Sequence, residues 1–529
     1  MNKVSNYICL LIFILTGGFL SILIGMEKQP FDTITYHFYI AYAFLNDRLG
    51  TDFCVGGTNT YLNPIVEIPF YLAVKYFNNF PKTVAFVFGT GYGIYLFVLY
   101  NLLRLLVKNK SKKITLTFIV FAMLIAATGH IASINIATTY HDMTATTILF
   151  IAICLIFRYK NNRWTQVLAG ALTGVAVGIK LQCGVFFAAL ILTMLFCKKD
   201  FQKPYKSIIS YVAGFFAGLG LYSGFWFYKV YKTFGNPIFP YWNNIFHSKY
   251  AEDLVLKKDL FQYPQNALQT VLYPYWLIFN QKDGLRDLRL STVYTLFFAC
   301  LGLFALAKAK TARALSILNR YFYWNRCKFL IIFGVFSYLF WMILCPYSRY
   351  IMPIETLSGM LICLFTFLIL LTARKPLLWV LTLFVITITL VGTTKTSVEH
   401  RVPFNNKVLY FDDAKIPDGA TVLLSHINNC SPSAVIPFQN PKARYIFYPS
   451  LNNDLTPITD ISKIIERGEL YIITDIPNYY TKNEAISKSI QADLKDKVTP
   501  ADCKALKSNI DIEIVVCKLK ATGINECIF

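Results

Sequence analysis

Asp32 is the first candidate for chemistry, because it lies a few residues beyond the first long apolar segment of the chain. An aromatic run follows it and contains Tyr36 and His37. A carboxylate at the boundary between membrane and water is well placed to act on a lipid head group. It can serve as a general base that takes a proton from an acceptor hydroxyl. Asp32 can equally cap a helix that begins at Thr33, and the sequence favours neither role.

A second acidic candidate, Asp142, follows Tyr140 and His141 between two apolar segments. It can act as a second acidic site residue or a metal ligand, but capping of the helix that follows is the favoured interpretation. Lys180 also lies between two apolar runs. A lysine there is costly unless it reaches water or a partner. It can therefore pair with a lipid phosphate, or extend its ammonium group to the membrane surface.

Arg349, with Tyr350 beside it, lies between two further apolar segments. A guanidinium makes bidentate contacts with phosphate oxygens, and an anionic leaving group needs such a partner as its charge develops. An ion pair with an acidic residue is the alternative. Tyr61 and Asn236 lie in loops that contain proline, and we include them as substrate-binding candidates. Anchoring at the membrane interface is the favoured role for most residues of the Asn236 loop.

The composition places these candidates in a membrane protein. Of the 529 residues, 55% are hydrophobic and only 15% are charged, and the mean hydropathy is +0.47. A soluble domain carries nearer a quarter charged residues. The net charge of +22 would indicate nucleic acid in a soluble protein, but the basic residues cluster here in short loops between apolar segments, where they report topology. We therefore expect no nucleic-acid partner.

The 13 cysteines form no CxxC pair and no Cys/His ligand spacing, which argues against a structural zinc site. Most of them lie in apolar segments as small core residues. Cys430, Cys503, Cys517 and Cys527 lie in the polar C-terminal part of the chain. They can form disulfides if that part is outside the cytoplasm, but the sequence does not show which residues pair.

Apolar segments predict about eleven membrane spans of roughly helix-crossing length. The first has no cleavage signal and is expected to be retained. The expected spans are residues 6–25, 83–103, 115–131, 144–157, 165–180, 183–197, 208–228, 291–307, 329–345, 353–372 and 377–393.

Basic residues follow every even-numbered span, from Arg104 and Lys108 after the second to Arg374 and Lys375 after the tenth. The positive-inside rule then places the N-terminus in the cytoplasm and the C-terminal part outside. We expect a transmembrane catalytic domain over residues 1–393, with outer loops 26–82 and 229–290. The other outer loops would converge on Asp32.

Residues 394–529 are expected to form a small extracytoplasmic α/β domain. This part of the chain has candidate strands bounded by turn residues and a helical pattern near residues 483–496. The candidate strands are Thr421–Leu424, Tyr445–Tyr448, Leu470–Thr474 and Ile512–Val516.

Taken together, these residues resemble the GT-C class of membrane glycosyltransferases, which includes protein O-mannosyltransferases and lipid A aminoarabinose transferases. The resemblance covers the chain from Phe31 to about Pro353. It rests on Asp32 just after the first span with Tyr36 and His37, on Tyr61 to Pro64, on Tyr140 to Asp142, on Gly235 to Pro240 and on Arg349 to Pro353.

The resemblance implies an inverting transfer of a hexosyl or pentosyl group from a polyprenyl-phosphate carrier to an extracytoplasmic glycan, lipid or protein. Asp32 would be the catalytic base, Asp142 the second acidic site and Arg349 a phosphate contact. Many members carry paired acids in the first outer loop, whereas Thr33 follows Asp32 here. We therefore expect no metal or other cofactor. The Lys-, Asn- and Ile-rich usage suggests a bacterium, which would make the membrane the inner (plasma) membrane.

Two alternatives stay open. An O-antigen polymerase or ligase would carry a large outer loop rich in Arg and His, and loop 229–290 contains His247, Arg286 and Arg289. That loop has no acidic residue beside a span exit as Asp32 is placed. A transporter of lipid-linked glycans would show charges within spans and often repeated halves. The sequence has few such charges and no internal repeat.

Overall fold

The computed structural model describes residues 3–27, 31–251, 262–279, 288–373, 401–425, 432–448, 469–476, 498–509 and 513–521. The chain forms two compact units, which we describe separately. The helical unit comprises Met1–Gly25, Ala85–Ser223 and Lys258–Arg401. The sheet unit comprises Met26–Val84, Gly224–Lys257 and Val402–Phe529.

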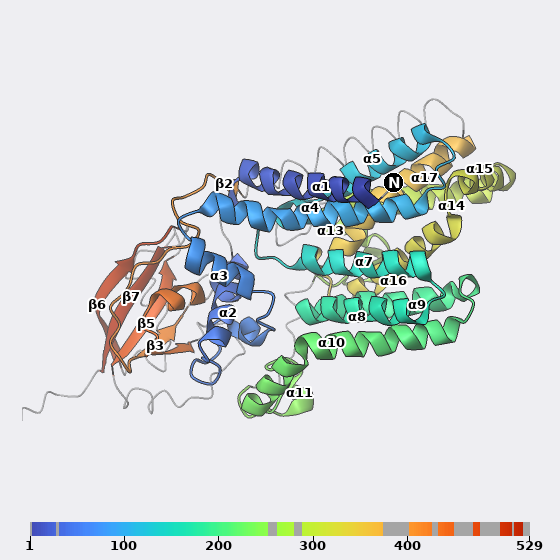
Figure 1. Ribbon diagram of the computed structural model, residues 1–529. Coiled ribbons are helices and arrows are strands. Elements are labelled where there is room, and N and C mark those ends of the chain that lie inside the picture. Colours follow the sequence, from blue (N-terminus) through green and yellow to red (C-terminus); the bar gives the residue numbers. More distant parts are fainter. Residues whose placement is uncertain are drawn as a thin grey trace, which may run out of the picture. The chain divides into compact units, whose positions relative to one another are not determined.

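The helical unit is built from long apolar helices, of which α7, α8 and α10 lie side by side in Figure 1. Its helices are α1 (Lys3–Ile24), α4 (Pro81–Leu106), α5 (Lys112–Ala127), α6 (His130–Ile134), α7 (Asp142–Tyr159), α8 (Arg163–Ile179), η3 (Leu181–Cys183), α9 (Gly184–Phe196), η4 (Lys198–Asp200), α10 (Pro204–Phe234), α12 (Ala267–Val271), α13 (Tyr273–Phe279), α14 (Arg289–Leu306), α15 (Lys308–Tyr321), α16 (Trp324–Leu344), η6 (Ser348–Ile351) and α17 (Met352–Ala373).

The polytopic helical architecture is confirmed, but the expected number of about eleven spans is not. Seven helices among the described residues are long and apolar enough to cross a membrane. The segments expected at 115–131, 165–180 and 183–197 form helices of 16, 17 and 13 residues. A helix of 17 residues is only about 26 Å long, against about 30 Å for the hydrocarbon core. The segment expected at 377–393 lies outside the described residues.

Small residues let two helices of this unit touch at their backbones. Along α8, glycines recur every fourth residue, and Gly174 faces α10 so closely that a Cβ would lie 2.2 Å from the Phe215 carbonyl oxygen. From the opposite side, a Cβ on Gly218 would lie 2.1 Å from the Ala171 carbonyl oxygen. Close approach of this kind is what small residues provide between membrane helices, where burial of apolar surface gives little driving force.

The sheet unit combines the segment after α1, Met26–Val84, with the C-terminal part of the chain. Its elements are β1 (Met26–Glu27), η1 (Thr33–His37), α2 (Phe38–Leu45), η2 (Gly57–Tyr61), α3 (Ile68–Phe77), α11 (Asn243–Phe246), β2 (Arg401–Val402), β3 (Thr421–Leu424), η7 (Ser433–Phe438), β4 (Arg444–Phe447), β5 (Leu470–Ile476), β6 (Val498–Leu506) and β7 (Glu513–Ala521).

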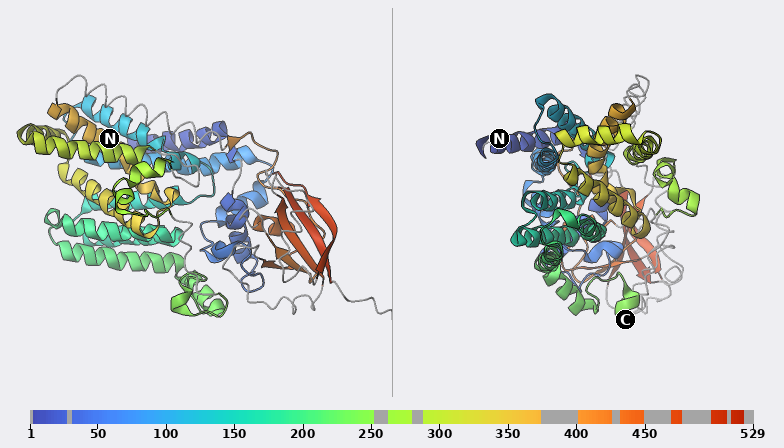
Figure 2. Two further views of the ribbon diagram at one scale, coloured as in Figure 1. Left: turned by 180° about the vertical axis from the view of Figure 1, so that it is seen from behind. Right: turned by 90° about the vertical axis from the view of Figure 1, so that its right-hand side faces the viewer.

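Five strands form one sheet in the order β4-β3-β5-β7-β6. β3 is parallel to both β4 and β5, whereas β7 is antiparallel to β5 and β6. Side chains alternate between the two faces, as a strand requires. Val422 and Leu424 pack with Phe38 and Tyr39 of the segment after α1, while Leu423 belongs to the apolar cluster of the other face. The views in Figure 2 show α2 and α3 over one face of the sheet.

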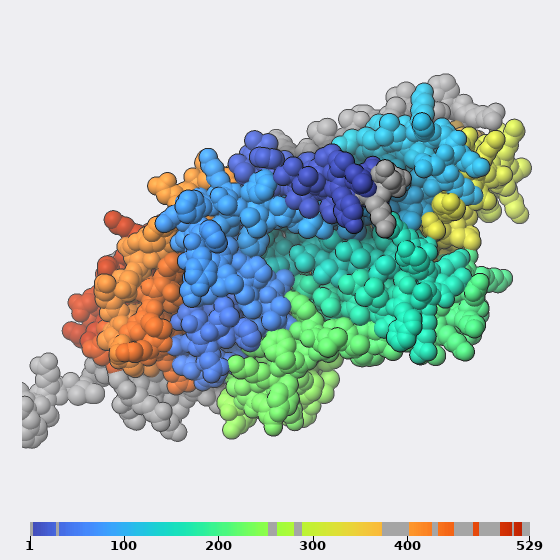
Figure 3. Space-filling view, in the orientation of Figure 1, coloured from blue at the N-terminus to red at the C-terminus, as the bar shows by residue number. Residues whose placement is uncertain are grey.

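The segment after α1 also extends the sheet edge. The backbone N–H of Phe53 donates to the Tyr445 carbonyl at 2.9 Å, and the N–H of Phe447 donates to the Phe53 carbonyl at 2.8 Å. Asp52, in a buried ion pair with Arg48, accepts the Tyr445 N–H at 2.9 Å. Figure 3 shows the lighter blue loop in contact with the orange C-terminal residues. Loop and tail therefore form one packed module.

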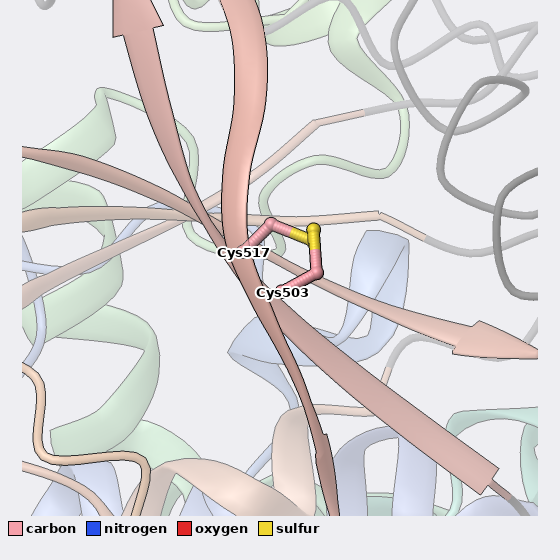
Figure 4. Close-up of a disulfide and its surroundings, with 2 residues drawn as sticks. All are labelled: Cys503 and Cys517. Carbon is pink, nitrogen blue, oxygen red and sulfur yellow. A yellow bond between two sulfur atoms is a disulfide. The ribbon is translucent and has the colours of Figure 1, made fainter.

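The expected small α/β domain is confirmed, with four strands close to their expected positions and one that was not expected. The unexpected strand, β6, contains Pro500 and lies at the sheet edge, where a missing N–H is tolerated. A disulfide joins Cys503 of β6 to Cys517 of β7, its neighbour in the sheet (Figure 4). Cys430, Cys527 and the helical pattern near 483–496 lie outside the described residues.

Candidate active site

In the sheet unit, Asp32 and His37 are brought together by an unusual turn of helix. Asp32 occupies the N-cap position of η1, a π-helix, but its side chain makes no capping hydrogen bond. A π-helix repeats its hydrogen bonds every five residues, so residues five apart lie one above the other. Asp32 Oδ2 accordingly lies 3.7 Å from His37 Nε2, and both side chains are buried.

A third residue of this group, Glu67, was missed by the sequence interpretation. Its carboxylate forms a buried hydrogen bond with His37 Nδ1. The imidazole therefore lies between two carboxylates. Burial alone lowers the pKa of His37, but the charges of Glu67 and Asp32 outweigh burial and raise the pKa to about 9. At neutral pH, His37 is an imidazolium held between two acids. The one sequence signal for Glu67 is that it is an acidic residue within the apolar run Ile65 to Pro69.

The other candidates of this unit have separate surroundings. Tyr36 stacks on His37 with ring centroids 4.3 Å apart, so it belongs to the Asp32 group. Tyr61 packs against Phe234 and Phe239, and its carbonyl accepts the Trp226 indole N–H at 2.8 Å. The Asn236 amide bonds the backbone of its own loop, donating to Tyr241 and accepting from Ile238.

In the helical unit, Asp142 is the first residue of α7, and His141 occupies the N-cap position. The ammonium group of Lys180, just after α8, lies 3.1 Å from each Asp142 carboxylate oxygen. Arg349 Nε lies 3.4 Å from Asp142 Oδ2. Two cations from different elements thus share one buried carboxylate, and the three side chains carry a formal net charge of +1. The ion-pair alternative for Arg349 is the contact observed.

Aromatic rings hold the two cations from their other sides. The Arg349 guanidinium lies 4.3 Å from the centroid of the Tyr140 ring, and the Lys180 ammonium lies 5.8 Å from that of Tyr350. Such cation–π contacts strengthen where water is excluded. Asp142, Lys180, Arg349 and Tyr350 are therefore one cluster, to which Tyr140 is added. His141 adjoins the cluster in the chain, as the N-cap residue of α7.

The Asp32 group belongs to the sheet unit and the Asp142 cluster to the helical unit. The convergence of all outer loops on Asp32 stays a prediction, as do the roles of the site residues.

The Asp32 group of the sheet unit contains side-chain types that can bind a metal ion. Carboxylates and imidazole are ligand types that Zn²⁺ uses. Here both ring nitrogens of His37 face carboxylates, and the raised pKa keeps both protonated at neutral pH. A metal at His37 would first have to displace a proton. The expectation of no cofactor stays a prediction.

Comparison with known proteins supports the fold. No family model matches the chain, and no curated protein matches it in sequence. The chain is similar in structure to ArnT from Cupriavidus metallidurans, solved bound to undecaprenyl phosphate, with a TM-score of 0.53 and 10% sequence identity. The match covers 97% of this chain and 98% of that chain. The GT-C resemblance is therefore confirmed at the level of the fold.

Proposed function

We propose that this protein is an integral membrane glycosyltransferase that moves one sugar from a polyprenyl-phosphate carrier to an extracytoplasmic acceptor. The observation that carries the proposal is the Asp142 cluster, in which Lys180 and Arg349 share one buried carboxylate. The ArnT structure of the same fold was solved with undecaprenyl phosphate. A site with an excess of positive charge and little water suits a phosphate that becomes more negative as a bond to it breaks.

In this proposal the carrier phosphate binds beside Arg349 and Lys180. A guanidinium offers several N–H donors in one plane and matches two phosphate oxygens at once. Asp142 holds the two cations in place and limits their excess charge, so that the carrier phosphate can also leave. The polyprenyl tail would lie in the bilayer.

The proposed base is Asp32. The acceptor hydroxyl gives its proton to Asp32 as its oxygen attacks the anomeric carbon from the face opposite the phosphate. The bond between that carbon and the phosphate oxygen breaks, the lipid phosphate leaves with the electron pair, and the configuration inverts. His37, held by Glu67, keeps Asp32 ionised by its positive charge. The mass of the missing sugar in the experiment below will distinguish a hexose from a pentose.

The proposed location is the inner membrane, with the N-terminus in the cytoplasm and the sheet unit outside. The pairing of Cys503 with Cys517 supports a location of the sheet unit outside the cytoplasm, because disulfides persist in oxidising compartments. The polymerase or ligase alternative expects catalytic Arg and His residues in loop 229–290. Arg289 is instead buried and donates to the Ile125 carbonyl and the Thr128 hydroxyl, which argues against that role.

The test is mass spectrometry of surface glycans and glycolipids from a deletion strain that carries wild-type protein, Asp32→Asn, or Asp47→Asn. Asp47 is an exposed acid of the same loop, paired with Lys229 at 2.8 Å, and serves as the matched control. We expect one sugar to disappear in the deletion and in Asp32→Asn, with its polyprenyl-phosphate form accumulating, while Asp47→Asn resembles wild type. Loss of whole glycan chains or trapped lipid-linked glycan, with no missing sugar, would support the two alternatives instead.

A further inference from the structure

One segment of the helical unit, residues 348–355, contacts residues 129–142 at two places. Arg349 touches the C-terminal end of that stretch, at Asp142 and Tyr140. Glu355, six residues later in the first turn of α17, touches its N-terminal end. The Glu355 carboxylate accepts the backbone N–H groups of Ile131 at 2.8 Å and Ala132 at 3.0 Å. The stretch that presents Asp142 is therefore held at both ends by the segment that carries Arg349.

The N-terminal contact is closely fitted. A Cβ at Gly129 would lie 2.5 Å from the carboxyl carbon of Glu355, so a side chain there would push the carboxylate away. Buried Arg289 holds the same break between α5 and α6 from another side, through Ile125 and Thr128. The carboxylate and its surroundings are almost fully buried, which makes each of these hydrogen bonds costly to lose.

Asn135 transmits this arrangement to the start of α7. Its side-chain amide donates to the Ile131 carbonyl at 2.9 Å, and its side-chain oxygen accepts the Met143 N–H at 3.2 Å. Met143 is the neighbour of Asp142. A continuous set of hydrogen bonds thus runs from Glu355 through the short helix α6 and Asn135 to the backbone beside the shared carboxylate.

We propose that Glu355 is a positioning residue that fixes Asp142 at the distance from Arg349 and Lys180 that phosphate binding requires. The inference rests on the proposed function, because it names the phosphate lipid as the ligand that senses this geometry. Loss of the Glu355 carboxylate leaves the Ile131 and Ala132 N–H groups without their acceptor, so residues 129–142 shift. The principal effect falls on carrier binding, since Asp142, Lys180 and Arg349 form the proposed phosphate site.

The test compares purified wild type with Glu355→Gln, Glu355→Ala and Gly129→Ala. Glu355→Gln keeps one acceptor oxygen, Glu355→Ala keeps none, and Gly129→Ala displaces the intact carboxylate. Thr356→Ala is the matched control, because Thr356 is equally buried on α17 and bonds Tyr95 at 3.0 Å instead. Two quantities are measured: the Kd for undecaprenyl phosphate, and hydrogen exchange of a peptide that covers residues 129–143.

We expect the Kd to rise about tenfold in Glu355→Gln, the size of one lost charge-assisted hydrogen bond, and further in Glu355→Ala. Gly129→Ala should resemble Glu355→Gln, and exchange over 129–143 should accelerate in all three. Thr356→Ala should leave both quantities unchanged even if its Tm falls. A lower Tm in the Glu355 variants with unchanged Kd would overturn the inference and leave a purely structural role. If wild type does not bind the lipid, the proposed function fails. Separately, unchanged hydrogen exchange over residues 129–143 in the Glu355 variants would exclude Glu355 as the residue that holds this stretch.

Discussion

The Asp32 group and the Asp142 cluster each contain a buried carboxylate, and different cations compensate its charge. Asp32 faces a histidine whose charge depends on a second acid, Glu67. Asp142 faces a lysine and an arginine. His37 keeps its proton until the pH rises through about 9, whereas the Arg349 guanidinium stays charged throughout. The first arrangement suits proton transfer and the second suits a permanent hold on an anion.

The two groups also differ in how their backbones are held. The π-helix that aligns Asp32 with His37 packs against the C-terminal part of the sheet unit, where the Ser433 hydroxyl donates to the Thr35 carbonyl at 2.5 Å. The Asp142 cluster is assembled from helix ends within the helical unit. This contrast gives separate expectations for variants of each group.

The largest expected effect is on turnover in Asp32→Asn. Loss of a positioned general base costs about 100- to 10,000-fold in rate. Because His37 keeps its bond with Glu67, we expect a folded protein with near-normal Tm. Initial rates of sugar release from the carrier, with Asp47→Asn as control, provide the measurement. A rate within threefold of wild type would remove Asp32 from the chemistry.

Asp142→Asn should act on stability more than Asp32→Asn does. It leaves Lys180 and Arg349 buried together without their shared carboxylate, and an uncompensated buried charge costs about 3–5 kcal/mol. Thermal unfolding in detergent should show a lower Tm, partly restored in the double variant Asp142→Asn with Lys180→Met. A Tm equal to that of wild type would mean that the ion pairs contribute nothing.

The sheet unit should lose stability at high pH through His37. Its folded pKa of about 9 exceeds its ordinary value of 6.5, so the stabilisation is fully present below pH 6.5 and is lost as pH rises through 9. The shift corresponds to about 3 kcal/mol. Tm measured from pH 7 to 10 should fall, and His37→Gln should flatten the profile. His247→Gln, an exposed histidine of the same unit, should not; an unchanged slope in His37→Gln contradicts the assignment.

The contact between α8 and α10 gives a smaller expected effect on stability. Two glycines of α10 should respond to substitution with opposite signs. Gly218→Ala places a Cβ 2.1 Å from the Ala171 carbonyl and should destabilise by about 1–3 kcal/mol. Gly220→Ala meets no atom within 4 Å and should be neutral or stabilise by up to about 1 kcal/mol through helix propensity. Equal Tm values for the two variants would show that α8 and α10 do not touch as described.

Local signals in the sequence predicted much of the fold. Runs of β-branched and apolar residues placed β3 and β5 correctly, because central strands carry such residues on both faces. β6 was missed because its proline and charged residues do not read as a strand, which only an edge position allows. The expected number of about eleven spans is not confirmed among the described residues, because apolar segments such as α9 form helices shorter than the membrane core.

The sequence indicated most of the charged residues of the candidate site but not which residues contact one another. Asp32, Asp142, Lys180 and Arg349 stood out as charges beside apolar segments. Glu67 and Glu355 did not, because their partners lie 30 and more than 220 residues away along the chain. The relation of Asp32 to His37 was also hidden, since five-residue spacing aligns side chains only in a π-helix.

The most direct test of this division of labour is the Kd for undecaprenyl phosphate of Asp32→Asn and Arg349→Gln, measured side by side by native mass spectrometry. Arg349→Gln removes the charged donor that we propose for the phosphate and should weaken binding about 10- to 100-fold. Asp32→Asn should bind within threefold of wild type while failing to transfer the sugar. The reverse result, weak binding in Asp32→Asn and normal binding in Arg349→Gln, would contradict the account.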